Sequence, residues 1–73
     1  MTTYNHMEML AMERIVRTYL RAPMYRLQDY ITINTGRDGR EYAWYIDEYN
    51  SVICDVETLE LCDDAEKIEA LLC

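Results

Sequence analysis

Apolar positions in the first twenty residues recur with the period of an α-helix. Six residues form the stripe: Met9, Met12, Ile15, Val16, Tyr19 and Leu20. Spacings of three and four place such side chains on one buried face of an amphipathic helix. Thr2, Thr3 or Asn5 can cap its start, because a short side-chain oxygen accepts a free backbone N–H there. Pro23 ends it, since the residue before a proline avoids helical dihedrals. The pattern predicts a helix over residues 3–21.

Alternating apolar and polar positions then predict strands over residues 29–34 and 40–47. Asp38-Gly39 lies between them, and glycine accepts the positive φ that a tight hairpin turn needs. A two-residue loop at this point sets Ile33 opposite Trp44. Loops of four or six residues would keep the same side chains facing one another.

A third strand is predicted to start near Ser51. A three-residue loop over 48–50, with Asn50 left-handed, is favoured because Asn tolerates that conformation. This register places six side chains on one face: Val52 opposite Ile46, Cys54 opposite Trp44, and Val56 opposite Tyr42. It buries the most apolar area, whereas a two-residue loop would place Trp44 beside Asp55.

The last sixteen residues predict a segment of open structure followed by a C-terminal helix. Residues 58–62 fit either a short fourth strand or a helical turn. Asp63 is expected to cap a helix that ends near Leu72, with Glu66 completing a capping-box-like pattern. Its inner stripe is Ala65, Ile68, Leu71 and Leu72.

Together these elements predict one α+β domain over residues 1–73. It has an N-terminal helix, an antiparallel meander of three or four strands, and a C-terminal helix. An antiparallel sheet commonly has one apolar face, and both helices are expected to cover that face. The other face is expected to be wet.

The expected outer face is partly aromatic and partly acidic. Its members are Tyr30, Thr32, Glu41, Ala43, Tyr45, Asp47, Ile53, Asp55 and Glu57. The chain has seven Tyr and no Phe, and tyrosine suits half-wet contact surfaces. Carboxylates beside tyrosines can receive Arg or Lys from a partner. An ordinary solvated sheet face explains the same residues equally well.

The charge is unevenly distributed along the chain. Net charge is −7, and residues 41–73 hold ten carboxylates against one lysine, Lys67. Such a field repels nucleic acid and anionic membranes and attracts cationic surfaces. Neither nucleic acid nor membrane is therefore expected as a direct partner. Four arginines are expected to pair with carboxylates of this chain or of a second subunit: Arg14, Arg17, Arg21 and Arg26.

No residue pattern carries a specific catalytic or metal-binding motif. His6 lies at the start of a helix, and catalysis needs a nucleophile or carboxylate held around it. The three cysteines at positions 54, 62 and 73 lack the short spacing of zinc ligands. Cys54 is expected in the core, Cys62 at its edge and Cys73 at a frayed terminus. We expect no cofactor, no metal and reduced thiols in a cytoplasm.

One family resemblance combines element order with charge. A tiny acidic chain of helix, meander and helix resembles small phage-encoded anti-defence proteins, including Cas9-inhibiting anti-CRISPR proteins. The segments that carry the resemblance are "GRDGREYAW" and "DEYNSVICDVETLELCDDAEKIE". It implies nucleic-acid mimicry, in which carboxylates occupy an Arg/Lys-lined site inside a host cytoplasm. The implied carboxylates are Glu41, Asp47, Glu48, Asp55, Glu57, Glu60, Asp63 and Asp64. The slightly basic N-terminal half favours one acidic face over mimicry by the whole surface.

The leading hypothesis is a non-enzymatic inhibitor or modulator that binds a basic protein surface. Its expected partner-binding residues are Tyr30, Glu41, Tyr45, Asp47, Glu48, Ile53, Asp55, Glu57, Glu60, Asp63 and Asp64. The alternative is a homo-oligomeric structural or accessory protein of a phage or bacterium, such as a homodimer. In that case the outer face or the stripe of the first helix pairs with itself.

Overall fold

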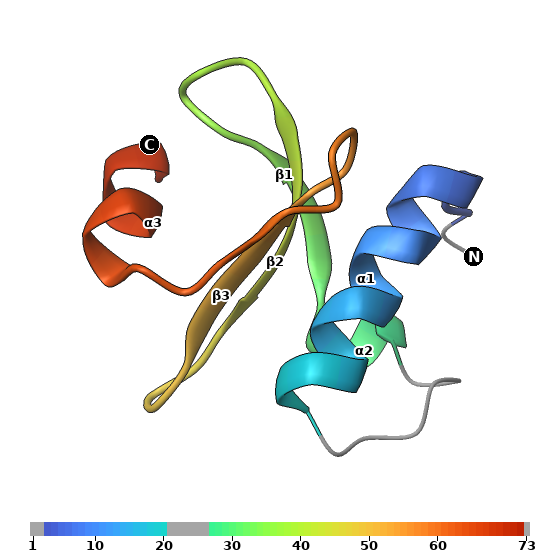
Figure 1. Ribbon diagram of the computed structural model, residues 1–73, viewed down its shortest axis with the longest axis horizontal. Coiled ribbons are helices and arrows are strands. Elements are labelled where there is room, and N and C mark those ends of the chain that lie inside the picture. The colour runs from blue at the N-terminus through green and yellow to red at the C-terminus, as the bar shows by residue number, and fades with distance from the viewer. Residues whose placement is uncertain (1–2, 21–26, 73) are drawn as a thin grey trace.

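A four-stranded antiparallel sheet lies between the N-terminal helix on one face and the shorter C-terminal helix on the other. The computed structural model describes residues 3–20 and 27–72 (Figure 1). The elements in order are α1 (His6–Tyr19), α2 (Leu27–Tyr30), β1 (Thr32–Thr35), β2 (Glu41–Ile46), β3 (Ser51–Asp55), β4 (Leu61–Cys62) and α3 (Ala65–Leu71). The strands lie side by side in the order β1-β2-β3-β4. The predicted α+β fold is confirmed, and the open choice at residues 58–62 resolves to a short fourth strand.

Helix α1 begins at a capping box. The Asn5 side chain accepts from the Glu8 N–H at 2.8 Å, and a Glu8 carboxylate oxygen accepts from the Asn5 N–H at 2.8 Å. Two backbone donors that lack helical partners are thereby satisfied. The helix is shorter than predicted and ends at Tyr19, which is 38% exposed rather than buried. Pro23, the expected stop, lies outside the described residues.

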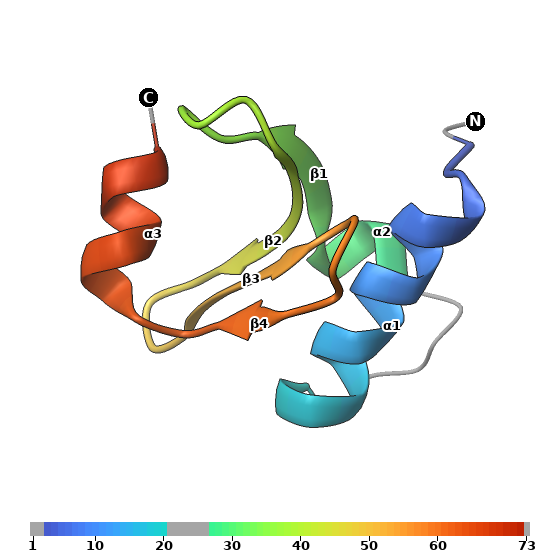
Figure 2. The same ribbon diagram turned by 45° about the horizontal axis from the view of Figure 1, so that its top comes forward.

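The two long helices cover opposite faces of the sheet, as Figures 1 and 2 show. Under α1 the core comprises Ala11, Met12, Ile15, Val16, Ile31, Ala43, Val52, Cys54 and Val56. Under α3 it comprises Tyr42, Trp44, Ile53 and Ile68. The prediction that both helices cover one face is therefore wrong. A chain of this length buries more apolar area when both faces of its sheet are used.

The first hairpin has a three-residue loop over 37–39. Gly36 N–H donates to the Arg40 carbonyl at 2.9 Å, and Gly39 adopts a left-handed φ of 83°. This is the loop type in which glycine closes a turn with a bulge. Ile33 pairs with Ala43, and Thr32 pairs with Trp44. The predicted pairing of Ile33 with Trp44 is wrong because an odd loop length moves the partner to the other face.

The entry to the first strand also differs from the prediction. Asp29 and Tyr30 belong to the short helix α2, and the strand begins only at Thr32. Between them Ile31 is fully buried in the core under α1. The alternation of apolar residues around Ile31 and Ile33 suggested a longer strand than the chain forms.

The second hairpin has a two-residue loop, Glu48-Tyr49. The Asp47 carboxylate accepts from the N–H of Tyr49 at 2.7 Å and of Asn50 at 2.6 Å. These bonds imitate a backbone turn and hold the loop. Trp44 therefore pairs with Ile53, and Tyr42 pairs with Asp55. The predicted three-residue loop is wrong, because Asp47 pairs with Asn50 and its side chain closes a two-residue loop.

The C-terminal helix is capped one residue later than predicted. The Asp64 side chain accepts from the Glu66 N–H at 3.0 Å, so Asp64 rather than Asp63 is the N-cap. Ile68 is buried under the helix, whereas Ala65 is exposed and Leu72 is 40% exposed. The helix thus contacts the sheet through a narrower stripe than the sequence indicated.

Candidate partner-binding surface

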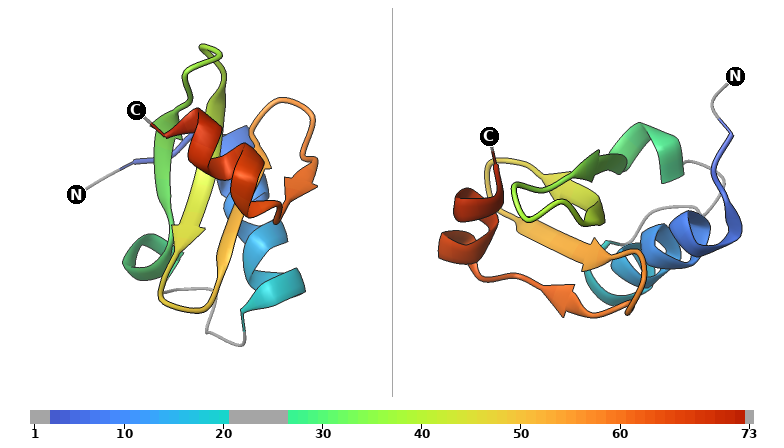
Figure 3. Two further views of the ribbon diagram at one scale, coloured as in Figure 1. Left: turned by 90° about the vertical axis from the view of Figure 1, so that its left-hand side faces the viewer. Right: turned by 90° about the horizontal axis from the view of Figure 1, so that it is seen from above.

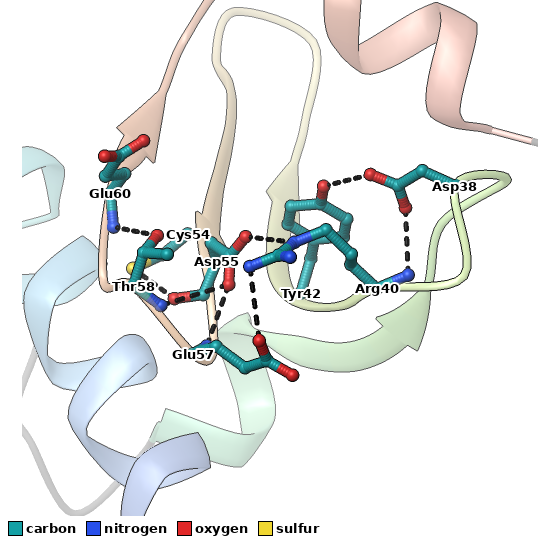
Figure 4. A network of polar contacts seen from close by, with 8 residues as sticks. All are labelled: Asp38, Arg40, Tyr42, Cys54, Asp55, Glu57, Thr58 and Glu60. Atoms are coloured by element: carbon teal, nitrogen blue, oxygen red, sulfur yellow. Dashed lines mark hydrogen bonds and ion pairs between the residues drawn. The ribbon is translucent and has the colours of Figure 1, made fainter.

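A partly buried ion pair lies where β3 meets the first hairpin (Figure 4). Arg40 Nε donates to Asp55 Oδ2 at 2.7 Å, and the whole Asp55 residue is only 9% exposed. The other oxygen, Oδ1, accepts from the N–H of Glu57 at 2.8 Å and of Thr58 at 3.2 Å. The bond from Arg40 is the main reason that the pKa of Asp55 lies below its ordinary value. Asp55 is therefore a structural carboxylate that holds the turn between β3 and β4.

Arg40 also reaches the edge of the acidic half of the chain. Its second nitrogen Nη2 lies 3.4 Å from Glu57 Oε2, and the Glu57 side chain is 77% exposed. Hydrogen bonding to Asp55 raises the pKa of Arg40 above its ordinary value. Arg40 was not a candidate in the sequence, because nothing in its local pattern indicates that β3 brings a carboxylate beside it.

Tyrosines and aspartates pair with each other within the chain. Tyr42 Oη donates to Asp38 Oδ2 at 2.5 Å, and Tyr45 Oη donates to Asp47 Oδ2. Burial, followed by the bond to Asp38, raises the pKa of Tyr42 to about 12. The bonds from the tyrosines lower the pKa of both aspartates. The carboxylates of Asp38 and Asp47 therefore already have donors and are less available to a partner.

Two glutamates meet between α1 and β2. Hydrogen bonding to Glu8 is the main reason that the pKa of Glu41 is raised, and burial and repulsion by Glu8 add to it. Both side chains are half-buried. Glu41 therefore interacts chiefly with α1 and is partly withdrawn from solvent.

A second group of carboxylates has much more open surroundings. It follows β3, crosses β4 and continues along α3. Six exposed residues define this acidic C-terminal surface: Glu57, Glu60, Asp63, Asp64, Glu66 and Glu69. Lys67 is the one cation between residues 57 and 69. Figure 3 (right) shows that the turn after β3 lies beside α1, whereas β4 leads to α3 at the opposite end of the molecule.

A shallow hollow lies between β4 and α3 within this surface. It has a volume of about 260 Å³, and its lining includes Tyr42, Glu60, Cys62 and Lys67.

The two described cysteines lie in different surroundings. Cys62 is half-buried in this hollow, as the sequence predicted, and Cys54 is fully buried in the core under α1. Burial is the main cause that raises the pKa of the Cys54 thiol to about 11. A thiol in that state is unreactive.

The expected outer face is not formed as a single surface. Ala43, Ile53 and Asp55 were placed there, but all three are buried, and Ile53 is only 2% exposed. The prediction of their exposure is wrong because α1 and α3 cover opposite faces of the sheet, and the shifted hairpin registers place Ala43 under α1 and Ile53 under α3. Other predicted residues are accessible: Tyr30, Asp47, Glu48, Glu57, Glu60, Asp63 and Asp64 are exposed, and Tyr45 is half-buried. Whether these residues bind a partner stays a prediction.

Other sequence candidates gain no partners from the fold. His6 is exposed in the first turn of α1. Arg14 and Arg17 make no ion pair with any described residue of this chain, and the alternative of pairing with a second subunit stays a prediction. Arg21, Arg26 and Cys73 lie outside the described residues. Within residues 3–20 and 27–72, no three metal-ligating side chains come together. None of the described helices has the length and apolar character needed to cross a bilayer.

Searches of protein families, curated proteins and solved structures match nothing to this chain.

Proposed function

We propose that the chain is a small acidic, non-enzymatic binding protein that occupies a basic surface of a nucleic-acid-handling protein and blocks or modulates it. The observation that carries this proposal is the acidic C-terminal surface. Its carboxylates are exposed, close together along the chain and accompanied by a single lysine. A rigid anionic surface attracts cationic sites and can take the place of nucleic-acid phosphates there.

The internal pairs narrow the set of contact residues. Asp38, Asp47 and Asp55 accept hydrogen bonds within the chain. Glu60 and Glu69 are exposed and have no such side-chain donor among the described residues. Carboxylates without internal donors lose less on meeting an Arg or Lys of a partner, because no existing bond has to break. Glu57, Asp63 and Asp64 have donors in Arg40, Tyr19 and the Glu66 N–H. Partner contact is therefore concentrated on Glu60, Glu66 and Glu69.

The resemblance to phage anti-defence proteins supplies the partner class to test first. A Cas9-type nuclease holds its nucleic acids in a positively charged channel. On this proposal the chain acts in a host cytoplasm, and it needs no cofactor because it performs no reaction.

Binding to a purified Cas9–guide complex tests the proposal through its salt dependence and a charge-matched pair of variants. Glu60→Gln/Glu69→Gln removes two charges from the acidic C-terminal surface. Glu13→Gln/Asp29→Asn removes two charges elsewhere. The first variant is expected to weaken binding at least tenfold and the second less than threefold, which are order-of-magnitude expectations for close charge pairs.

Raising salt from about 0.05 to 0.5 M should weaken binding of the unmodified chain, because screening acts on exposed charges. Binding that ignores salt, or that falls equally in both variants, contradicts an acidic contact surface. Absence of binding to this nuclease removes the Cas9 assignment, and the same pair of variants then applies to other basic nucleic-acid-binding proteins.

A further inference from the structure

Strand β1 is an open edge of the sheet. It pairs with β2 on one side, and no described strand pairs with its other side. Gly36 N–H donates to the Arg40 carbonyl. Asn34 and Thr32, two and four residues earlier, therefore also direct their backbone groups to β2. Ile33 and Thr35 alternate with them and direct their N–H and C=O groups outward. This edge therefore presents unpaired donors and acceptors in strand geometry.

Nothing in the sequence of β1 protects that edge. Proteins commonly block edges with Lys, Pro, bulges or inward-pointing charge. The sequence of Thr32–Thr35 is TINT, which has no charged residue and no proline. Ile33 is half-buried, and the other three residues are exposed. In a chain of net charge −7, an uncharged edge is the surface on which a second copy meets the least repulsion.

The residues that flank β1 carry opposite charges. Asp29 lies in α2 before the strand, and Arg37 lies in the hairpin loop after it, and both are exposed. In an antiparallel pair of two β1 strands, the beginning of one strand lies beside the end of the other. Arg37 of each copy is then brought near Asp29 of its partner. Because the two copies are related by a two-fold axis, this pair of opposite charges occurs at both ends of the contact.

The order of the sheet keeps the acidic surfaces apart in such a pair. Figure 3 (left) shows β1 and β4 along opposite sides of the sheet. The acidic C-terminal surface begins beside β4 and continues on α3. Two copies joined through β1 would carry these surfaces at the far sides of the assembly. Self-association through β1 is therefore compatible with binding of a basic partner.

We propose that β1 pairs antiparallel with β1 of a second copy, centred on Asn34, to form a continuous eight-stranded sheet. Ile33 of one copy exchanges hydrogen bonds with Thr35 of the other, and the two Asn34 side chains face each other across the axis. The contact is small, so the dimer is weak, with a dissociation constant above about 1 μM. It does not depend on the proposed partner-binding function.

Sedimentation equilibrium from about 10 μM to 1 mM, a range suited to so small an interface, measures the dimer. A reducing agent excludes crosslinks through Cys73. Arg37→Glu places two carboxylates together at each end and should weaken dimerisation at least tenfold. The double variant Asp29→Arg/Arg37→Glu restores opposite charges and should recover it to within threefold. Arg17→Glu on α1 makes the same charge change elsewhere and is the control.

Amide hydrogen exchange identifies the edge itself. Ile33 and Thr35 N–H should become protected as concentration rises, whereas Asn34 N–H should be protected at every concentration because it bonds to β2. A chain that stays monomeric up to 1 mM overturns the proposal. So does a dimer in which Arg37→Glu has no effect, in which the double variant fails to recover, or in which protection of Ile33 and Thr35 is independent of concentration.

Discussion

Arg40 and Asp55 are joined across two strands by a bond of 2.7 Å between Nε and Oδ2. The same carboxylate accepts two backbone N–H groups of the turn that follows β3. This single side chain therefore fixes the start of β2, the end of β3 and the loop that leads into the acidic C-terminal surface. Its removal should affect the whole fold.

We expect Asp55→Asn to lower the free energy of unfolding by about 2 to 4 kcal/mol, because it leaves Arg40 and the turn without a charged acceptor. Urea denaturation followed by circular dichroism measures the change. Glu57→Gln is the matched control, since its 3.4 Å contact with Arg40 is exposed, and it should cost less than about 1 kcal/mol. Equal losses in the two variants would contradict the structural role of Asp55.

Acid should destabilise the protein in a defined range. Hydrogen bonds from Tyr42, Tyr45 and Arg40 lower the pKa of Asp38, Asp47 and Asp55 respectively below 3.8. A carboxylate whose pKa is lower in the folded state stabilises the fold at pH values above its unfolded-state pKa. This stabilisation is lost as pH falls through its folded-state pKa. We therefore expect stability to decrease below about pH 4, where unfolded carboxyls begin to take up protons. Urea midpoints between pH 2.5 and 7 test this, and a flat profile below pH 4 would show that these bonds contribute little.

Glu41 should show the opposite sign. The pKa of Glu41 is raised beside Glu8, so ionisation of Glu41 is unfavourable in the folded state. The stability that protonated Glu41 contributes is therefore lost as pH rises through its unfolded-state pKa and then its folded-state pKa. Glu41→Gln should raise the melting temperature at pH 7 and have no benefit near pH 4. Glu48→Gln, on the exposed second hairpin, is the control and should change the melting temperature little at either pH.

The cover that α3 provides can be followed through the only tryptophan. Trp44 is 7% exposed and belongs to the same apolar cluster as Ile68. Ile68→Ala should cost about 2 to 5 kcal/mol and shift Trp44 emission to longer wavelength by admitting water. Leu72→Ala removes a side chain that is already 40% exposed, and its emission should match that of the unmodified chain. An unshifted spectrum in Ile68→Ala would mean that α3 does not shield Trp44.

Gly39 tests the loop that sets the register of the first hairpin. Its φ is 83°, and a Cβ there would contact nothing within 4 Å. Gly39→Ala therefore adds backbone strain without crowding and should cost about 1 kcal/mol, which lowers the melting temperature by roughly 4 to 8 °C. Gly39→Asn should cost less, because Asn tolerates the left-handed region. A loss of stability in Gly39→Asn as large as that in Gly39→Ala would argue against a left-handed backbone at this position.

The sequence by itself predicted α1, the first three strands and α3 in their correct order, but it did not predict α2 and left β4 open. Stripes such as Met12 with Val16 and turn residues such as Asp38-Gly39 act within a few positions, so local patterns predicted α1, both hairpins and α3. The charge asymmetry and the burial of Cys54 were likewise predicted from short stretches of the sequence.

Only the tertiary structure decided which side chains share a face. A hairpin loop one residue longer or shorter moves every partner to the other side of the sheet, and both loops differed by one from the expected length. Ile53 and Asp55 consequently moved from the expected surface into the interior, where Arg40 compensates the charge of Asp55. The position of α3 opposite α1 likewise depends on packing between segments distant in the chain, which no short stretch of sequence encodes.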